Sequence, residues 1–180
     1  SDLQDNSNAN VSVIEAFYVD SVYVGHLAID GNETNNTVLA NYYGIQLDNT
    51  SSSTIESVHI SEIQDDAVRL SDASNNKISG INATFNSDSG VNLLNTSVDN
   101  HITENYIANN TGSGVIINGA ASTNNIISNN QIDDNGSRGI QTAAARTFIT
   151  GNNIFSSGNR GISVTNTSGD NIISNNVVSN

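Results

Sequence analysis

The sequence predicts an all-β protein: a right-handed, single-stranded parallel β-helix of about seven coils. An apolar sequence motif recurs every 22 to 25 residues, and a second aliphatic residue follows each of the first five leading isoleucines by 13 residues. A small residue, glycine or alanine, directly precedes that second aliphatic residue. Repeats of this length cannot bury their apolar sides alone and must stack on one another. The leading residues, expected to form an internal ladder, are Ile55, Ile78, Ile102, Ile127, Ile149 and Ile173.

Within each repeat, short extended pieces alternate with polar corners. Residues 115–117 (Val-Ile-Ile) read as an alternating strand, and residues 108–114 read as a corner rich in Asn, Gly and Ser. The apolar spacing never settles at three and four residues, which argues against a helix. We expect the β-helix to cover residues 14–180, with residues 14–37 as a degenerate first coil led by Ile14 and an incomplete last coil. Residues 1–13 are then an N-terminal extension or a donated strand.

A second set of equivalent positions supports this alignment of the repeats. An asparagine follows the leading isoleucine by three residues in four consecutive coils. Stacked amide side chains can hydrogen-bond to each other from coil to coil. The members of this predicted asparagine ladder are Asn105, Asn130, Asn152 and Asn176.

Composition excludes several classes of function. A net charge of −13 with only five Lys and Arg argues against nucleic acid as a partner. No apolar run is long enough to span a membrane, and the chain has no cysteine. The acceptor motif for N-glycosylation occurs about as often as chance allows, so glycosylation is permitted without being indicated. Its positions are Asn10, Asn32, Asn35, Asn49, Asn82, Asn95, Asn109, Asn135 and Asn166.

The repeat, Asn-x-Ile-x-x-Asn-x-Ile followed by Gly-Ile or Gly-Val, is clearest at residues 125–132 with 138–140, and at 149–154 with 160–162. It resembles the right-handed β-helix repeat of the NosD-like and pectate-lyase-like superfamily. That resemblance implies the fold and leaves the function open, because the superfamily includes polysaccharide lyases, hydrolases, epimerases, viral tailspikes and non-catalytic surface proteins. In its enzymes, substrate generally lies along one sheet, across outward side chains of stacked strands.

Along the strand after the small residue, only Asp30, Asp48 and Arg69 look like a catalytic set. A uronate lyase or epimerase needs a base and a cationic group of this kind. An exposed salt bridge on a solvated face is the alternative interpretation. Arg138 and Arg160 share one register in adjacent coils and are candidates for binding carboxylates or sulfated glycans, although they can equally face backbone carbonyls.

The adjacent Asp65 and Asp66 resemble the paired aspartates of polygalacturonases, but the Gly-His-Gly and Arg-x-Lys motifs of that family do not occur in this sequence. Corner chemistry explains such a pair as well. The two carboxylates are also weak candidates for Ca²⁺ ligands. No other metal site and no cofactor motif is visible, so Ca²⁺ is the one candidate cofactor.

Charge is uneven along the chain: residues 1–68 hold eleven Asp and Glu and no Lys or Arg, while residues 135–169 hold three arginines and no acid. Oppositely charged, uncapped ends suggest head-to-tail association of copies, for which residues 11–13 are a suitable donated strand. The leading hypothesis is therefore a non-catalytic extracellular or cell-surface structural protein that assembles end to end. The alternative is a polysaccharide-active or glycan-binding module.

Overall fold

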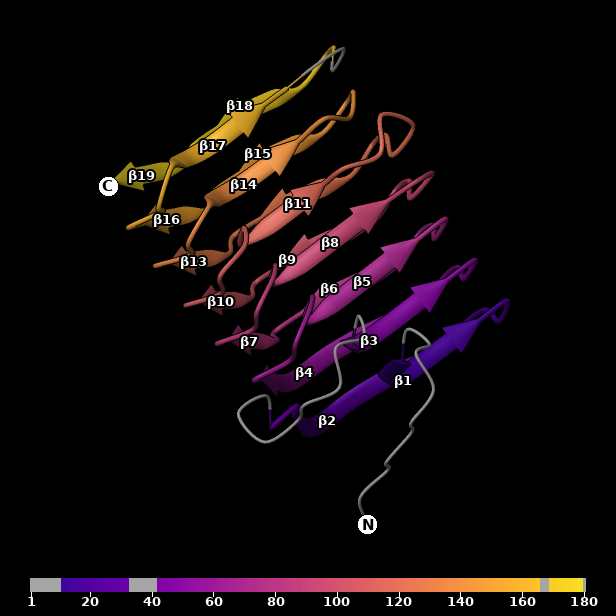
Figure 1. Cartoon of the computed structure of the whole chain (residues 1–180). Coiled ribbons are helices and arrows are strands. Elements are labelled where there is room, and N and C mark those ends of the chain that lie inside the picture. Colours follow the sequence, from indigo (N-terminus) through magenta and orange to yellow (C-terminus); the bar gives the residue numbers. More distant parts are fainter. Residues whose placement is uncertain (1–10, 33–41, 166–168, 180) are drawn as a thin grey trace.

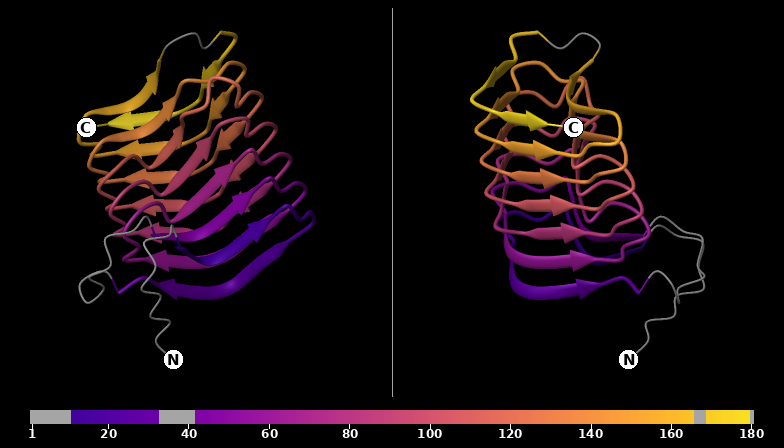
Figure 2. Two further views of the ribbon diagram at one scale, coloured as in Figure 1. Left: turned by 45° about the vertical axis from the view of Figure 1, so that its right-hand side comes forward. Right: turned by 90° about the vertical axis from the view of Figure 1, so that its left-hand side faces the viewer.

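The computed structural model describes residues 11–32, 42–165 and 169–179. Every strand in these ranges pairs in parallel with a strand of a neighbouring coil, and the coils stack into a rod (Figures 1 and 2). No helix occurs among the described residues, and so none that could cross a membrane. The predicted parallel β-helix is confirmed, with the apolar residues of successive coils stacked inside it.

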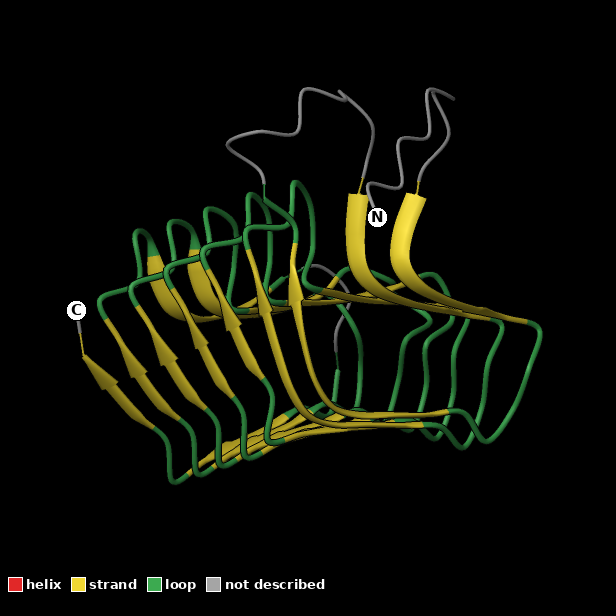
Figure 3. Cartoon of the chain, turned by 90° about the horizontal axis from the view of Figure 1, so that it is seen from below, coloured by secondary structure: helices red, strands yellow, loops and turns green. Residues whose placement is uncertain are grey.

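One face of the rod is a seven-stranded sheet in the order β1-β3-β5-β8-β11-β14-β17. Each coil contributes one strand to this sheet, so neighbouring strands of the sheet come from consecutive coils (Figure 3). The strands are β1 (Val11–Phe17), β3 (Tyr42–Asp48), β5 (Val68–Ser71), β8 (Val91–Leu94), β11 (Val115–Ile117), β14 (Arg138–Thr142) and β17 (Arg160–Val164).

The remaining strands form a twelve-stranded sheet with two arms that meet at β4 (Thr54–Ser61). β4 runs through the bend and pairs with β6 (Lys77–Ser79) by its first half and with β7 (Asn82–Thr84) by its second. β2 (Tyr23–Asp30) pairs along the whole of β4. The arms continue through β9 (His101–Thr103), β12 (Ile126–Ser128), β15 (Phe148–Thr150) and β18 (Ile172–Ser174), and through β10 (Tyr106–Ala108), β13 (Gln131–Asp133), β16 (Asn153–Phe155) and β19 (Val177–Ser179).

The bend between the two arms is made by a residue in the left-handed conformation, two positions after each leading isoleucine. This residue is Ser57, Glu104 or Asn129 in three of the coils, with φ between 53° and 58°. Glycine takes the position at Gly80 and Gly151, where φ is 60° and 68°. Glycine carries no Cβ and adopts this conformation without steric cost. Each coil therefore turns at a fixed point, which keeps the stacked strands in register.

The leading isoleucines form one continuous column, because each is the direct strand partner of the next. Those from Ile55 to Ile149 are completely buried. Ile173 stacks on Ile149 but remains 48% exposed, since it belongs to the last described coil. Burial of one isoleucine side chain contributes about 1.5–3 kcal/mol, so this column is a main source of stability.

Asparagine side chains line the corners in three hydrogen-bonded ladders. In the ladder read from the sequence, the Nδ2 groups of Asn105, Asn130 and Asn152 each donate 2.9 Å to the Oδ1 atom of the next asparagine, ending at Asn176. Each acceptor oxygen also takes a backbone N–H from the coil before, for example that of Asn105 at 3.0 Å. These contacts satisfy polar groups that the turns bury. The two other ladders are Asn76-Asn100-Asn125 and Asn86-Asn110-Asn135.

The N-terminal register differs from the expectation that Ile14 leads the first coil. Ile14 pairs with Ile45 and through it with Val68, so it occupies the second aliphatic position. The leading position is taken by Val24, which pairs with Ile55. Residues 11–13, considered above as an extension or a donated strand, belong to β1 and pair with β3 of the same chain. They are therefore engaged within the molecule.

Candidate functional site

Two rows of side chains lie next to each other where the strands of the seven-stranded sheet begin. We call the first the corner row; backbone hydrogen bonds and strand pairing align its members, which are Tyr43, Asp66, Ser89, Ser113, Arg138 and Arg160. The outward row, three residues further on in each coil, consists of Gln46, Arg69, Asn92, Ile116, Gln141 and Ser163. Side chains of the two rows touch at several points, so the rows belong to one region, in which Tyr43, Asp66, Ser89 and Ser113 are buried beneath the outward row.

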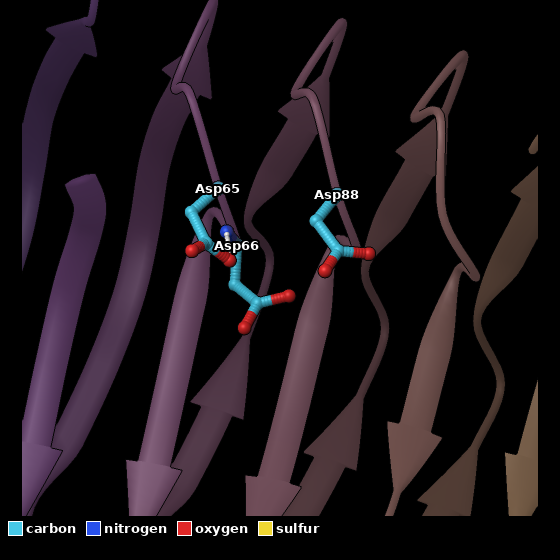
Figure 4. Close-up of side chains that lie close together, drawn as sticks. All are labelled: Asp65, Asp66 and Asp88. Carbon is cyan, nitrogen blue, oxygen red and sulfur yellow. Dashed lines mark hydrogen bonds between the residues drawn. The ribbon is translucent and has the colours of Figure 1, made fainter. Parts of the chain in front are cut away.

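Three aspartates gather at this surface, between β5 and β8 (Figure 4). Asp65 and Asp66 lie in the corner just before β5, and Asp88 holds the place of Asp65 one coil later. Carboxylate oxygens of the three residues lie within 4.8 Å of one another. Asp66 is buried, Asp65 is half-buried and Asp88 is exposed. The cluster therefore runs from the interior of the corner out to solvent.

The buried carboxylate of Asp66 is held by two donors from the next coil. Asn92 Nδ2 donates to Asp66 Oδ2 at 2.8 Å, and the backbone N–H of Ser89 donates to Asp66 Oδ1 at 3.1 Å. The N–H of Asp66 itself donates to Asp65 Oδ1 at 2.9 Å, which orients the Asp65 carboxylate. These hydrogen bonds are of the kind that an aspartate pair forms in a turn, and they fix the geometry of the cluster.

Burial raises the pKa of the Asp66 carboxyl from 3.8 to about 7. The hydrogen bond from Asn92 opposes this rise, while the negative charges of Asp65 and Asp88 add to it. Burial also raises the pKa of Asp65, and the charge of Arg69 partly offsets that effect. Carboxyl groups this close titrate together, and the group as a whole can accept or release a proton near neutral pH.

Arg69 supplies the positive charge of the site. Its guanidinium carbon lies 4.4 Å from the centroid of the Tyr43 ring, and its Nη1 donates a hydrogen bond to the Tyr43 hydroxyl. The aromatic face and the hydroxyl fix the guanidinium beside the carboxylates. Arg69 Nε is buried and has no hydrogen-bond partner among the described residues. The remainder of the side chain is half-exposed, where it can meet an anionic ligand.

Carboxylate oxygens are the ligands that Ca²⁺ prefers, and three of them at this spacing are able to share one cation. The Asp65–Asp66 pair named from the sequence gains Asp88 as a third member. A Ca²⁺ ion at this cluster stays a prediction.

The trio of Asp30, Asp48 and Arg69 expected from the sequence is not brought together. Asp30 ends β2 on the twelve-stranded sheet, where it pairs with Ser61. Asp48 lies on β3 but pairs with Ser71, whereas Arg69 pairs with Gln46. The error follows from the shifted N-terminal register, which placed Asp30 on the wrong face. The carboxylate whose pKa the charge of Arg69 lowers is the corner residue Asp65.

Arg138 and Arg160 are direct strand partners on β14 and β17. Arg138 is half-buried and donates from Nη1 to Gln141 Oε1 at 2.8 Å, while Arg160 is exposed. Both belong to the corner row that also contains Asp66.

The acceptor asparagines differ in accessibility. Asn135 is 1% exposed, and its Oδ1 accepts a hydrogen bond from the Asn110 side-chain amide. The folded coil has no room for a glycan there, so Asn135 is removed from the candidate glycosylation positions. Exposed positions are Asn32, Asn49, Asn95 and Asn109, and Asn82 is half-buried. Asn10, Asn35 and Asn166 lie outside the described residues.

A family model described as a right-handed beta helix region matches residues 25–178. No curated protein matches the chain in sequence. Among solved structures, the chain resembles the periplasmic alginate epimerase AlgG, with a TM-score of 0.79 and 15% identity over 93% of this chain and 42% of that chain. Tailspike protein 2 of bacteriophage CBA120, an enzymatically active domain, gives 0.64 and 14% over 94% and 33%. The A-module of the Azotobacter vinelandii mannuronan C-5 epimerase AlgE6 gives 0.53 and 17% over 86% and 57%.

This chain thus spans about two-fifths of the epimerase AlgG. At these identities the likeness concerns the fold. The structures found are nevertheless named as enzymes, several of them polysaccharide epimerases. The leading expectation, a non-catalytic structural protein that assembles end to end, is therefore wrong, and its alternative is the better-supported one. Head-to-tail association of copies stays a prediction.

Proposed function

This chain belongs to the family of right-handed β-helix proteins, and we propose that it acts on an acidic polysaccharide laid across the outward face of its seven-stranded sheet. The observation that carries the proposal is the cluster of Asp65, Asp66 and Asp88 just before β5 and β8, close enough to Arg69 for its charge to lower the pKa of Asp65. It combines a buried carboxyl, Asp66, whose pKa is raised to about 7, with a cation that is fixed by Tyr43. The epimerases of alginate and mannuronan among the similar structures support a uronate polymer as the substrate.

Removal of the proton at C5 of a uronate requires a base and a cation that stabilises the negative charge on the sugar carboxylate. Asp65 is half-buried, oriented by the Asp66 N–H and close enough to Arg69 for that charge to lower its pKa. In the proposal Asp65 takes the C5 proton and Arg69 binds the sugar carboxylate. Asp66 lies beneath them and sets the charge of the cluster. Return of a proton to the other face gives epimerisation, and loss of the C4 oxygen gives elimination.

Glycoside hydrolysis is a second candidate, favoured by the close spacing of Asp65 and Asp88. Hydrolysis uses one protonated and one ionised carboxyl group, and the raised pKa values at this cluster can provide both. The two candidates differ in pH dependence. If the reacting Asp65 carboxyl acts as a base, activity falls as pH drops below its raised pKa, whereas an acid loses activity as pH rises above that pKa.

The test is incubation of the wild-type protein with mannuronan, polygalacturonate and a neutral glucan in deuterated water. Deuterium at C5 indicates proton abstraction, an ultraviolet-absorbing unsaturated end indicates elimination, and new saturated reducing ends indicate hydrolysis. We expect turnover of a polyuronate that falls at least about hundredfold in Asp65→Asn and in Arg69→Ala. The matched control is Glu15→Gln, which removes an exposed charge on β1 of the same sheet.

Turnover that persists in both variants places the chemistry elsewhere, and failure to modify any polymer contradicts the proposal. Repeating the assay with a calcium chelator tests the cation prediction at the same cluster. We also propose that the protein works outside the cytoplasm. The periplasmic enzyme and the phage tailspike among the similar structures support that location.

A further inference from the structure

Arg138 and Arg160 continue the corner row beyond the aspartate cluster. Backbone hydrogen bonds of one repeated type join Asp66, Ser89, Ser113 and Arg138 through the small residue of the preceding coil. Arg138 then pairs directly with Arg160. At about 4.8 Å for each coil, Arg138 lies about 14 Å and Arg160 about 19 Å along the sheet from Asp66. The two arginines and the acid–base cluster therefore share one surface and one direction.

No carboxylate on this part of the sheet neutralises the two arginines. The strands β11, β14 and β17 contain no Asp or Glu, and residues 135–169 contain no acid at all. Side chains between the cluster and the arginines in the corner row are the hydroxyls of Ser89 and Ser113. In a protein with a net charge of −13, this is a local positive surface.

The pairing of Arg138 with Arg160 is unfavourable for the protein alone, because like charges directly opposite each other on neighbouring strands repel. The side chain of Arg138 is nevertheless held in place by Gln141 from the outward row. An anion between the two guanidinium groups would remove the repulsion and accept hydrogen bonds from both.

We propose that Arg138 and Arg160 bind acidic groups of the same glycan chain whose reacting sugar lies at Asp65 and Arg69. This inference rests on the proposed function and adds to it a polyanionic substrate that spans at least the coils from β5 to β17. One coil is about as long as one extended sugar unit, so a chain of about four or five units covers this distance. Between the two ends, a sugar passes Ile116, which is half-buried and carries no charge, while Ser113 is buried.

Substrate length follows directly from this arrangement. A disaccharide fills only the cluster and gains nothing from the arginines, whereas a longer oligomer gains both contacts. Replacement of the arginines is expected to raise KM for long oligomers and to leave KM for the disaccharide unchanged.

The test measures binding in an Asp65→Asn background, in which turnover is removed and binding can be followed alone. Into it are introduced Arg138→Ser with Arg160→Ser, serine being the residue of the same row in the neighbouring coils. The control is Arg146→Ser. Arg146 belongs to the same cationic segment, but it lies at another corner and donates from Nε to Asn124 at 2.7 Å. Ser52 holds the equivalent corner position in an earlier coil, with a φ of 53° like that of Arg146.

Calorimetry with a polyuronate, a sulfated dextran and neutral dextran separates carboxylate, sulfate and uncharged ligands. We expect the double variant to bind the preferred polyanion at least about tenfold more weakly, with a shallower salt dependence, and Arg146→Ser to bind it like the parent. Unchanged binding in the double variant overturns the inference, as does an equal loss in Arg146→Ser, which would reflect net charge alone.

The experiments distinguish a failure of this inference from a failure of the proposed function. Binding that depends on Arg138 and Arg160 without turnover in the wild type supports the inference and contradicts the enzyme. Turnover whose dependence on chain length is unaffected by the two substitutions supports the enzyme and contradicts the inference.

Discussion

Replacement of Asp66 by asparagine should stabilise the folded protein at neutral and alkaline pH. Asn and the protonated carboxyl have nearly the same shape, and Ser89 N–H can still donate to the side-chain oxygen at position 66. Asn92 Oδ1 is buried without a partner among the described residues, so a flip of the Asn92 amide lets it accept the new N–H. The substitution therefore removes a buried negative charge while the hydrogen bonds are retained.

The magnitude follows from the pKa of the Asp66 carboxyl, which rises from 3.8 to about 7 on folding. Because the pKa of Asp66 is higher in the folded than in the unfolded protein, protonation of Asp66 favours the folded state. This contribution to the free energy of unfolding is complete below about pH 4 and is lost as pH rises to about 7. A shift of about three units corresponds to about 4 kcal/mol at pH 8. Asp66→Asn should keep its stability over this range, so its advantage over the wild type grows from near zero at pH 4 to about 4 kcal/mol.

Urea denaturation followed by circular dichroism at pH 4, 6 and 8 measures this difference. Glu15→Gln, which removes an exposed carboxylate from the same sheet, serves as the control and should show little change. The reasoning is refuted if Asp66→Asn is less stable than the wild type at pH 8, or if both proteins lose stability equally between pH 4 and pH 8. In activity assays the same variant should move the pH dependence away from 7, because the cluster has lost its buried titrating member.

Three further substitutions test the fold itself, each by urea denaturation. Ile127→Ala leaves a cavity in the buried isoleucine column and should cost about 2–5 kcal/mol; a neutral result would place Ile127 outside the core. Asn130→Ala removes the acceptor of the Asn105 N–H and should cost about 1–3 kcal/mol, whereas the exposed neighbour Gln131→Ala should cost little, and equal losses would argue against the ladder. Phe85 has a φ of 59° and is 60% exposed, so Phe85→Asn should stabilise by about 1 kcal/mol; a loss would reveal an unrecognised contact.

The repeat predicted the core because stacking requires the same kind of side chain at the same place in every coil. From Ile55 to Ile173 the spacing of the leading residues sufficed to identify direct strand partners. It failed in the first coil, where β1 and β2 are long strands of seven and eight residues. Apolar residues alternate along such long strands and offer more than one plausible register, so Ile14 was matched to the wrong column.

The candidate site was only partly accessible from the sequence. Asp65 and Asp66 attracted notice as neighbours, but Asp88 lies 23 residues after Asp65, and no local motif joins them. Alignment of the residues just before each strand, in addition to those within it, would have set Asp88 beside Asp65. The raised pKa of Asp66 could not be predicted, because it depends on burial that the three-dimensional packing creates.

The central claim is that an acidic glycan reacts at the aspartate cluster of the seven-stranded sheet. A crystal structure of the Asp65→Asn variant with a uronate oligomer tests it most directly. The account predicts sugar units across β5, β8, β11, β14 and β17, with one carboxylate at Arg69 and the C5 atom of that sugar facing residue 65. An oligomer bound to the twelve-stranded sheet, or one that leaves Arg69 without contact, would contradict it.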